Sequence, residues 1–219
     1  MAAPKLSDLT REKTLLALWL TSFKFRQKSF NYVVTAAVAL GLARYCQLDW
    51  DQPQILMAAF RKIQSTGFSF ATSILGFLVA GFTVFVTVIR IDMFLTMAKM
   101  EKTDTGESVL KYNLSAFIIT FVHYTSYIFV CLISELFLQP GGLAAIFLAN
   151  AKTYPNLVSI VPVVHSLCSA ALLVGLGAWT VYLVLLLKSF IYNVYQVTTV
   201  SVAYAWQSSD EAKPPSDGK

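Results

Sequence analysis

A long apolar run without any ionisable group, GFSFATSILGFLVAGFTVFVTVI, extends from Gly67 to Ile89. About 20 such residues in a helix cross the roughly 30 Å hydrocarbon core of a bilayer. The composition agrees, because 56% of the residues are hydrophobic and only 13% are charged, unlike an ordinary soluble domain. The run therefore predicts a membrane-spanning helix, and the chain is expected to be an integral membrane protein in contact with the lipid bilayer.

Apolar segments of spanning length recur along the chain. The predicted spans are residues 30–48, 67–89, 114–138 and 157–187. The first is short and is interrupted by Arg44 near its end. The stretches between the first and second spans and between the third and fourth are short and contain apolar pieces, which we expect to lie in the membrane interface. The predicted fold is all-α and polytopic, with four transmembrane helices.

The ends of the chain differ from the membrane domain, which we place at residues 30–206. Residues 1–29 are basic and contain LLALWLTSF, from Leu15 to Phe23, which is too short to span a membrane. Leu15, Leu18, Trp19 and Phe23 follow helical spacing, so this piece is predicted to be an interfacial helix. Residues 207–219 read as a disordered tail.

The distribution of basic residues predicts the orientation of the spans. Thirteen lysines and arginines fall in the N-terminal segment, the loop after the second span and the tail, whereas three fall on the opposite side. Basic residues near spans tend to remain in the cytoplasm. The four-span arrangement therefore predicts that both termini are cytoplasmic.

Several functional classes find no support in the sequence. The net charge of +5 comes from basic residues beside the spans, and they form no dense stripe typical of nucleic-acid binding. The chain has no phosphate-binding glycine loop, no HExxH motif and no nucleophile elbow. Its three cysteines are odd in number and lie in or beside spans, which favours buried thiols. We therefore expect no enzymatic activity, no cofactor, no metal and no nucleic-acid partner.

Ionisable residues inside spans are costly and become functional hypotheses. Arg44, near the outer end of the first span, and Glu135, near the outer end of the third, are predicted to lie at a similar depth. We expect them to form a structural ion pair. The alternatives are a Glu135 side chain that reaches the interface alone and a Glu135 that handles protons.

Two histidines fall in the middle of adjacent antiparallel spans. His123 and His165 are predicted to lie at depths within about a turn of each other and form a polar pair. Hydrogen bonds to nearby tyrosines and serines are one role, and a proton relay or pH sensor is another. A metal site that includes Cys131 and Cys168 is conceivable from the residue types, but the spacing is too wide for us to adopt it.

Two surfaces are candidates for association. In the second span Thr72, Gly76 and Ala80 recur at every fourth position, which is typical of a close helix-packing face. The partner of this face is another span of the same chain or a second copy. The second and fourth spans are also predicted to continue into the cytoplasm as helices with apolar stripes. These stripes either pack on each other or bind another subunit.

Two functional classes remain. One is a non-catalytic membrane subunit that anchors, senses or regulates and signals to a soluble cytoplasmic protein through its projecting helices. The other is an oligomeric channel or a pore-forming effector, although the spans carry few polar residues with which to line a pore. In either case a homo-oligomer is expected.

The overall plan is similar to that of a known class of membrane proteins. A basic N-terminal segment ending in KFRQK, four spans and almost no soluble domain resemble the small membrane subunits of bacterial phage-defence systems, such as the membrane component of Kiwa. The likeness covers the four-span region and is one of plan, without a shared motif. It implies a membrane sensor in antiviral defence, located in the bacterial inner membrane, that works with a separate soluble effector.

Overall fold

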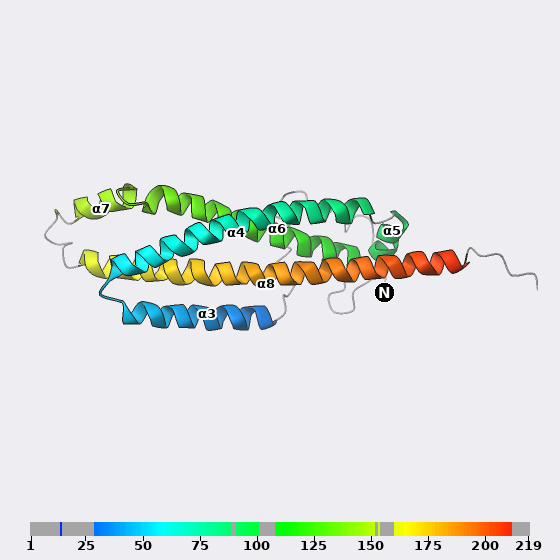
Figure 1. Ribbon diagram of the computed structural model, residues 1–219, viewed down its shortest axis with the longest axis horizontal. Helices are drawn as coiled ribbons and strands as arrows, with labels where there is room; N and C mark the ends of the chain where they lie inside the picture. Colours follow the sequence, from blue (N-terminus) through cyan, green and yellow to red (C-terminus); the bar gives the residue numbers. More distant parts are fainter. Residues whose placement is uncertain are drawn as a thin grey trace, which may run out of the picture. The chain divides into compact units, whose positions relative to one another are not determined.

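The computed structural model describes residues 14, 29–88, 91–100, 108–151, 153 and 160–211. The predicted basic segment lies outside these residues except for Thr14 and Ser29, and so does the tail from residue 212. The helices are α3 (Ser29–Leu48), α4 (Pro53–Val88), α5 (Ile91–Lys99), α6 (Val109–Leu138), α7 (Leu143–Ala151) and α8 (Ile160–Glu211) (Figure 1). The described part of the chain is all-helical, as the sequence predicted.

Three of the described helices are long and apolar enough to cross a membrane. These segments are Pro53–Thr87, Val109–Leu138 and Ile160–Ala203. They overlap the second, third and fourth predicted spans, of which residues 89 and 157–159 lie outside the described residues, so an integral membrane protein is supported. Helix α3 occupies the first predicted span but is not one of the three. The fourth crossing and the orientation therefore remain predictions.

Helix α4 begins earlier than the predicted second span. The stretch after Asp51 was expected to be an interfacial connection, but it is helical from Pro53 onward. Proline suits the first turn of a helix because its missing N–H has no partner there in any case. Leu56, Phe60 and Gln64 follow at four-residue spacing and are all buried. This buried face gives the connection a packing surface and makes it part of the bundle.

Helix α8 is longer than the predicted fourth span at its C-terminal end. It has 52 residues and continues to Glu211, so residues 207–211 of the predicted tail are helical. The connection from α6 to α7 turns at Gly141, whose φ of 76° is readily available only to glycine. Helix α7 itself has no buried side chain among its described residues.

The chain forms two compact units, each built from pieces of several helices. Unit 2 contains Gln27–Phe77 and Phe121–Leu186, and unit 1 contains Met1–Arg26, Leu78–Thr120 and Leu187–Lys219. In unit 2, α3 runs alongside α8 (Figure 1). The Tyr32 and Tyr182 rings stack with centroids 6.2 Å apart, and the Cys46 thiol lies 4.0 Å from the Ala170 carbonyl oxygen. These contacts set α3 antiparallel to α8.

Glycines allow the helices of unit 2 to approach closely. A Cβ added at Gly67 of α4 would collide with the Tyr127 hydroxyl of α6. A Cβ at Gly177 of α8 would lie 2.6 Å from Leu42 Cδ1 of α3 and 3.7 Å from Ile63 Cδ1 of α4. Small residues are favoured at helix contacts in lipid for this reason. The packing of α4 on α6 therefore depends on the absence of a side chain at Gly67. The packing of α3 on α8 depends in the same way on Gly177.

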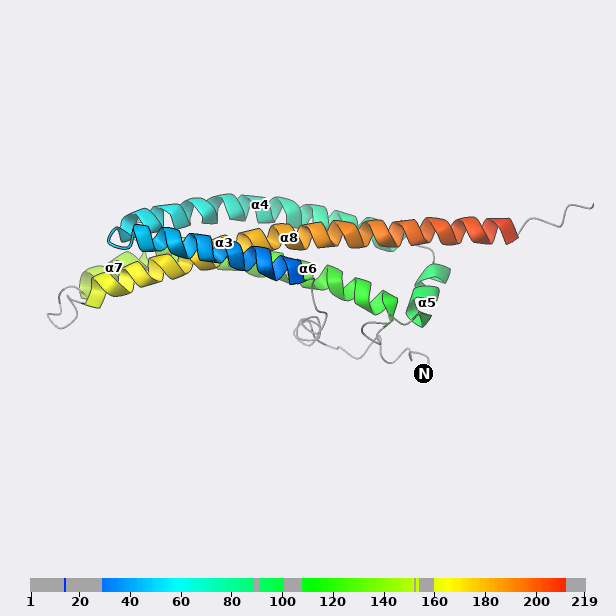
Figure 2. The same cartoon turned by 90° about the horizontal axis from the view of Figure 1, so that it is seen from below.

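The core of unit 1 is a cluster of phenylalanines. Phe117 of α6 lies at its centre, 4.8 Å from Phe85 and 4.9 Å from Phe190 between ring centroids. Phe94 of α5 joins the cluster through an edge contact with Phe85 at 6.1 Å. Helix α5 lies between the end of α4 and the beginning of α6 (Figure 2). Its Met93 and Met97 are buried, so the apolar stripe predicted after the second span packs inside unit 1.

Candidate functional site: a polar clamp between α4 and α6

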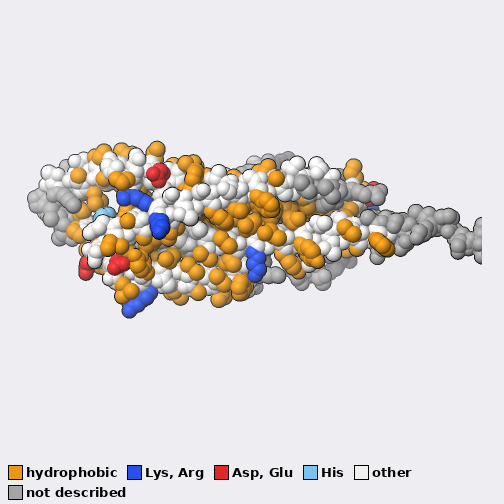
Figure 3. Space-filling model, in the orientation of Figure 1, with side chains coloured by type: hydrophobic (Ala, Val, Ile, Leu, Met, Phe, Trp, Pro, Cys, Tyr) orange, Lys and Arg blue, Asp and Glu red, His pale blue; other side chains and the backbone are white. Residues whose placement is uncertain are grey.

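Charged side chains in the described part of unit 2 gather at one end of its helices. They are Arg44, Asp49, Asp51, Arg61, Lys62 and Glu135. This is the end where α3 finishes, α4 begins and α6 finishes. Apolar side chains cover most of the visible face of unit 2 beyond it (Figure 3). Such a division is typical of a boundary between the hydrocarbon core of a membrane and its polar interface.

The centre of this end is Gln64 of α4, which is 3% exposed. Its Nε2 donates hydrogen bonds to the Cys131 carbonyl oxygen and to Glu135 Oε2 of α6, both at 2.9 Å. One buried amide thus holds the backbone and a carboxylate of the neighbouring helix. Hydrogen bonds to charged groups contribute about 1.5–3 kcal/mol, more than neutral ones. Gln64 therefore fixes the angular position of α6 against α4.

Arg61, one turn before Gln64, binds the end of α6. Its Nε and Nη2 donate to the Leu138 carbonyl oxygen at 3.2 and 2.9 Å. Leu138 is the last residue of α6, where carbonyl groups have no partner within the helix. A cation at this position also interacts favourably with the negative end of the helix dipole. Arg61 and Gln64 together form the polar clamp, which joins the first turns of α4 to the last turns of α6.

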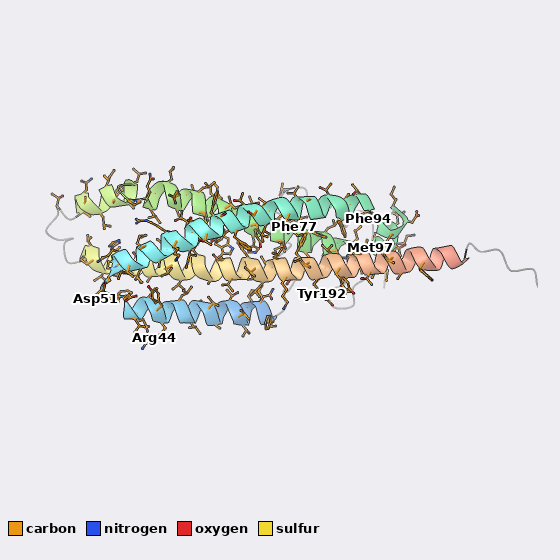
Figure 4. The ribbon with its side chains drawn as sticks, in the orientation of Figure 1. Arg44, Asp51, Phe77, Phe94, Met97 and Tyr192 are labelled. Carbon is orange, nitrogen blue, oxygen red and sulfur yellow. The ribbon has the colours of Figure 1, made fainter. Side chains whose placement is uncertain are left out.

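The predicted ion pair is not formed between the described side chains of Arg44 and Glu135. Arg44 is exposed and its Nη1 donates to Gln47 Oε1 of its own helix at 3.0 Å. Figure 4 shows the Arg44 side chain pointing away from α4 and α8. Residue number along a helix predicts that both residues lie near the same boundary, but it does not predict the direction in which each side chain faces. Because α3 packs on α8, Glu135 finds its partner on α4 instead.

The two histidines also have separate surroundings. The His123 ring makes an edge contact with Tyr182, with centroids 5.2 Å apart. Along α8, Tyr182 follows His165 by about 17 residues, or roughly 25 Å of helix. The structure therefore does not bring His123 and His165 together. The predicted pairing of the two histidines assumed that both spans were centred on the membrane. The register of α6 against α8 differs from that assumption.

The register of α6 against α8 is set by two tyrosines that the sequence analysis considered only as hydrogen-bond partners of the histidines. Tyr124 donates its hydroxyl to the Leu183 carbonyl oxygen at 3.0 Å. The Tyr127 hydroxyl and Thr180 Oγ1 form a hydrogen bond of 2.7 Å. Both tyrosines are fully buried. Their three-residue spacing on one helix face was the available signal, since a buried tyrosine needs a partner for its hydroxyl.

The predicted packing face of α4 is exposed in the chain. Thr72, Gly76 and Ala80 all lie on the surface, and a Cβ at Gly76 would have no neighbour within 4 Å. The Thr72 hydroxyl is already bonded to the Phe68 carbonyl oxygen at 2.8 Å. Packing of this face against another helix of the same chain is therefore absent among the described residues. A second copy as its partner remains a prediction.

The polar clamp has the composition of a structural joint. Among the described residues, no group of three or more His, Cys, Asp or Glu side chains is arranged to hold a metal ion. Glu135 is an acceptor for Gln64, and Arg61 is bound to a backbone carbonyl, so the clamp holds two helices together at one end. No family model, no curated protein and no solved structure matches this chain.

Proposed function

We propose that this chain is a non-catalytic integral membrane subunit that signals to a soluble cytoplasmic protein. The observation that carries the proposal is the length of α8. Its apolar segment Ile160–Ala203 has 44 residues, which is roughly 66 Å of helix and about twice the hydrocarbon core. The surplus exposes apolar side chains to water unless protein covers them. A helix of this kind is suited to contact a partner outside the membrane.

Two further features support a four-span arrangement with both termini in the cytoplasm. Helix α3 exposes Phe30, Val33 and Leu40 although it packs on α8, which favours lipid around it. The excess of basic residues in the N-terminal segment, the α5 region and the tail favours the cytoplasmic side for all three. The polar clamp then lies at the outer boundary, where a membrane event reaches α4 and α6 first.

The partner test uses photo-crosslinking in living cells. A photoreactive amino acid at Tyr195, on the exposed part of α8, is expected to give an adduct with a soluble protein. The matched control is Val163, which is 57% exposed on the first turns of the same helix and is expected to face lipid. An adduct at Val163 with the same protein, or adducts at Tyr195 with membrane proteins alone, contradicts the proposal.

The topology test uses reporter fusions. Fusions after Lys102 and after Lys219 are expected to behave as cytoplasmic, and fusions at Gln54 or Lys152 as exported. An exported C-terminus contradicts the four-span model. From the plan-level resemblance we also propose the bacterial inner membrane as the location and antiviral defence as the setting. Deletion of the gene is then expected to increase phage plating in the native host.

A pore-forming oligomer is the second candidate, and the exposed face of α4 favours it. Thr72, Ser73 and Thr83 lie there with hydroxyls bonded to backbone carbonyls four residues earlier, at 2.8–2.9 Å. Such hydroxyls are compatible with contact between copies or with a narrow polar path. The purified protein is expected to form a discrete homo-oligomer but to pass few ions in liposomes. Constitutive conductance favours the pore instead.

A further inference from the structure

Helix α5 lies across the long helices of unit 1. Figure 2 shows it crossing the direction of the nearby part of α8, and Figure 1 agrees. The edge contact of Phe94 with Phe85, together with the buried Met93 and Met97, holds the inner face of α5 against the bundle. A helix that lies across membrane-spanning helices runs roughly along the plane of the membrane. Its level along the spans then decides whether it meets lipid.

Both ends of α5 are tied to the ends of candidate spans. The apolar segment of α4 ends at Thr87, and α5 begins at Ile91, at most about 14 Å further along the chain. At the other end of α5, the Val109 N–H donates to the Met100 carbonyl oxygen at 2.9 Å, and Val109 is the first residue of α6. The chain connection and this hydrogen bond fix α5 at the level where the apolar segments of α4 and α6 end.

The distribution of charge along α6 places that level at a membrane boundary. Between Lys111 and Glu135, α6 has about 23 residues without a charged side chain, roughly 35 Å of helix. This length is close to the roughly 30 Å hydrocarbon core, so the core is expected to end near Lys111. Val109 lies within one turn of Lys111 and is bonded to the residue that follows α5. Helix α5 is therefore expected between the hydrocarbon core and the headgroups.

The outward side of α5 is mainly apolar. Ile91 is 76% exposed and Leu95 54%, and one turn of helix separates them. These two residues are named the outer α5 face. The neighbouring Thr96 hydroxyl is bonded to the Asp92 carbonyl oxygen at 2.9 Å, so it does not require water. Lys99, in the last turn, is exposed and long enough to reach the headgroups. An apolar face with a basic residue at its edge is typical of helices in a membrane interface.

We propose that the outer α5 face inserts into the headgroup boundary of the same bilayer that α4 and α6 cross. Insertion by about 5–10 Å suits a short helix that spans hold in place at both ends. A protein partner fits less well, because two side chains on a helix of nine residues offer far less area than the roughly 800 Å² that each partner buries in a stable complex. The placement of α4 and α6 in a membrane is sufficient for this insertion, whichever way the chain is oriented, and no soluble partner is required.

Fluorescence quenching by lipid tests the insertion directly. The full chain carries Cys168→Ser, since Cys168 is exposed while Cys46 and Cys131 are buried. Leu95→Cys then carries an environment-sensitive fluorophore on the outer α5 face. The purified protein is placed in nanodiscs of phosphatidylcholine that is brominated near the glycerol end of its acyl chains. Unreactive Cys46 and Cys131 verify that each labelled variant is folded.

Two other exposed positions serve as references for the quenching. Val86→Cys is the lipid reference, because Val86 is 45% exposed near the end of the apolar segment of α4. Trp206→Cys is the water reference, because Trp206 is 71% exposed and follows Phe190 by roughly 24 Å of helix. Quenching at position 95 is expected to approach that at position 86 and to exceed that at position 206 several-fold. Equal quenching at positions 95 and 206 overturns the proposal. A blue-shifted emission at position 95 that bromine does not quench also overturns it, since it identifies a protein cover such as a second copy.

Removal of the two apolar side chains provides an independent check. Ile91→Ser combined with Leu95→Ser is expected to release α5 from the bilayer, so that trypsin cleaves after Lys99 roughly tenfold faster in nanodiscs of phosphatidylcholine. The matched control is Val200→Ser combined with Val202→Ser, because both valines are similarly exposed on α8. This control is expected to leave cleavage after Lys99 unchanged. Equal cleavage rates in the two double variants contradict the insertion of α5.

Discussion

The Gln64 amide and the Glu135 carboxylate lie 2.9 Å apart, and the same amide nitrogen reaches the Cys131 carbonyl oxygen. This relationship replaces the expected pairing of Glu135 with Arg44. A buried neutral side chain, rather than a second charge, satisfies the carboxylate at the end of α6. Glu135 itself is exposed at this end of α6, so its charge is not enclosed in the apolar core and does not require an arginine beside it.

The first prediction compares the two possible partners of Glu135. In a double-mutant cycle, Gln64→Ala and Glu135→Ala are expected to show a coupling free energy of about 1.5 kcal/mol, because each substitution removes the same hydrogen bond. This is the low end of the range for a bond to a charged group, since Glu135 is exposed. Arg44→Ala and Glu135→Ala are expected to be additive within about 0.5 kcal/mol. Thermal unfolding in detergent measures both cycles. Strong coupling at Arg44 and none at Gln64 would restore the ion pair.

The second prediction concerns Arg61 at the end of α6. Arg61→Ala is expected to destabilise the protein by about 1–2 kcal/mol, because it removes both hydrogen bonds to Leu138 and a cation at the helix end. Arg61→Lys keeps the charge and is expected to recover part of the loss. Lys62→Ala is the control, since Lys62 is an exposed neighbour. Equal stability losses at positions 61 and 62 contradict the role of the clamp.

The third prediction uses two glycines of α4. Gly67→Ala is expected to destabilise the protein, because the new Cβ collides with the Tyr127 hydroxyl and breaks its bond to Thr180. Tyr127→Phe in the same chain is expected to restore part of the stability by removing the colliding oxygen. Gly76→Ala is the control and is expected to be neutral or stabilising by about 0.5–1 kcal/mol, from helix propensity. A harmless Gly67→Ala disproves the close contact.

The fourth prediction tests the docking of α3 on α8. Gly177→Val is expected to displace Leu42 and to loosen α3, because a Cβ there lies 2.6 Å from Leu42 Cδ1. Limited proteolysis is expected to cut earlier in the connection between α3 and α4. Leu42→Ala in the same chain provides space and is expected to restore protection. Gly175→Val, where a Cβ has no neighbour within 4 Å, serves as the matched control. Equal cleavage of the two glycine variants refutes the contact.

The amino-acid sequence alone predicts that this chain is helical and suited to a membrane. A long uncharged run such as Gly67–Ile89 is favourable in lipid and unfavourable in water. In lipid its backbone N–H and C=O groups must bond to one another, which a helix achieves. The three candidate spans coincide with predicted ones for this reason. The sequence also placed Arg44 and Glu135 near one end of the helices, since depth along a helix follows directly from residue number.

Which side chains meet follows from the packing of the helices and could not be predicted from the sequence. Partners across helices depend on rotation and register, and these are set by particular contacts rather than by average hydropathy. Tyr124 and Tyr127 fix α6 against α8, so His123 lies beside Tyr182 and far from His165. Gly177 provides the space in which Leu42 packs, so α3 lies against α8. Glu135 accepts its hydrogen bond from Gln64 of α4. An apolar run specifies burial in lipid, whereas shape and hydrogen-bond geometry select the neighbour.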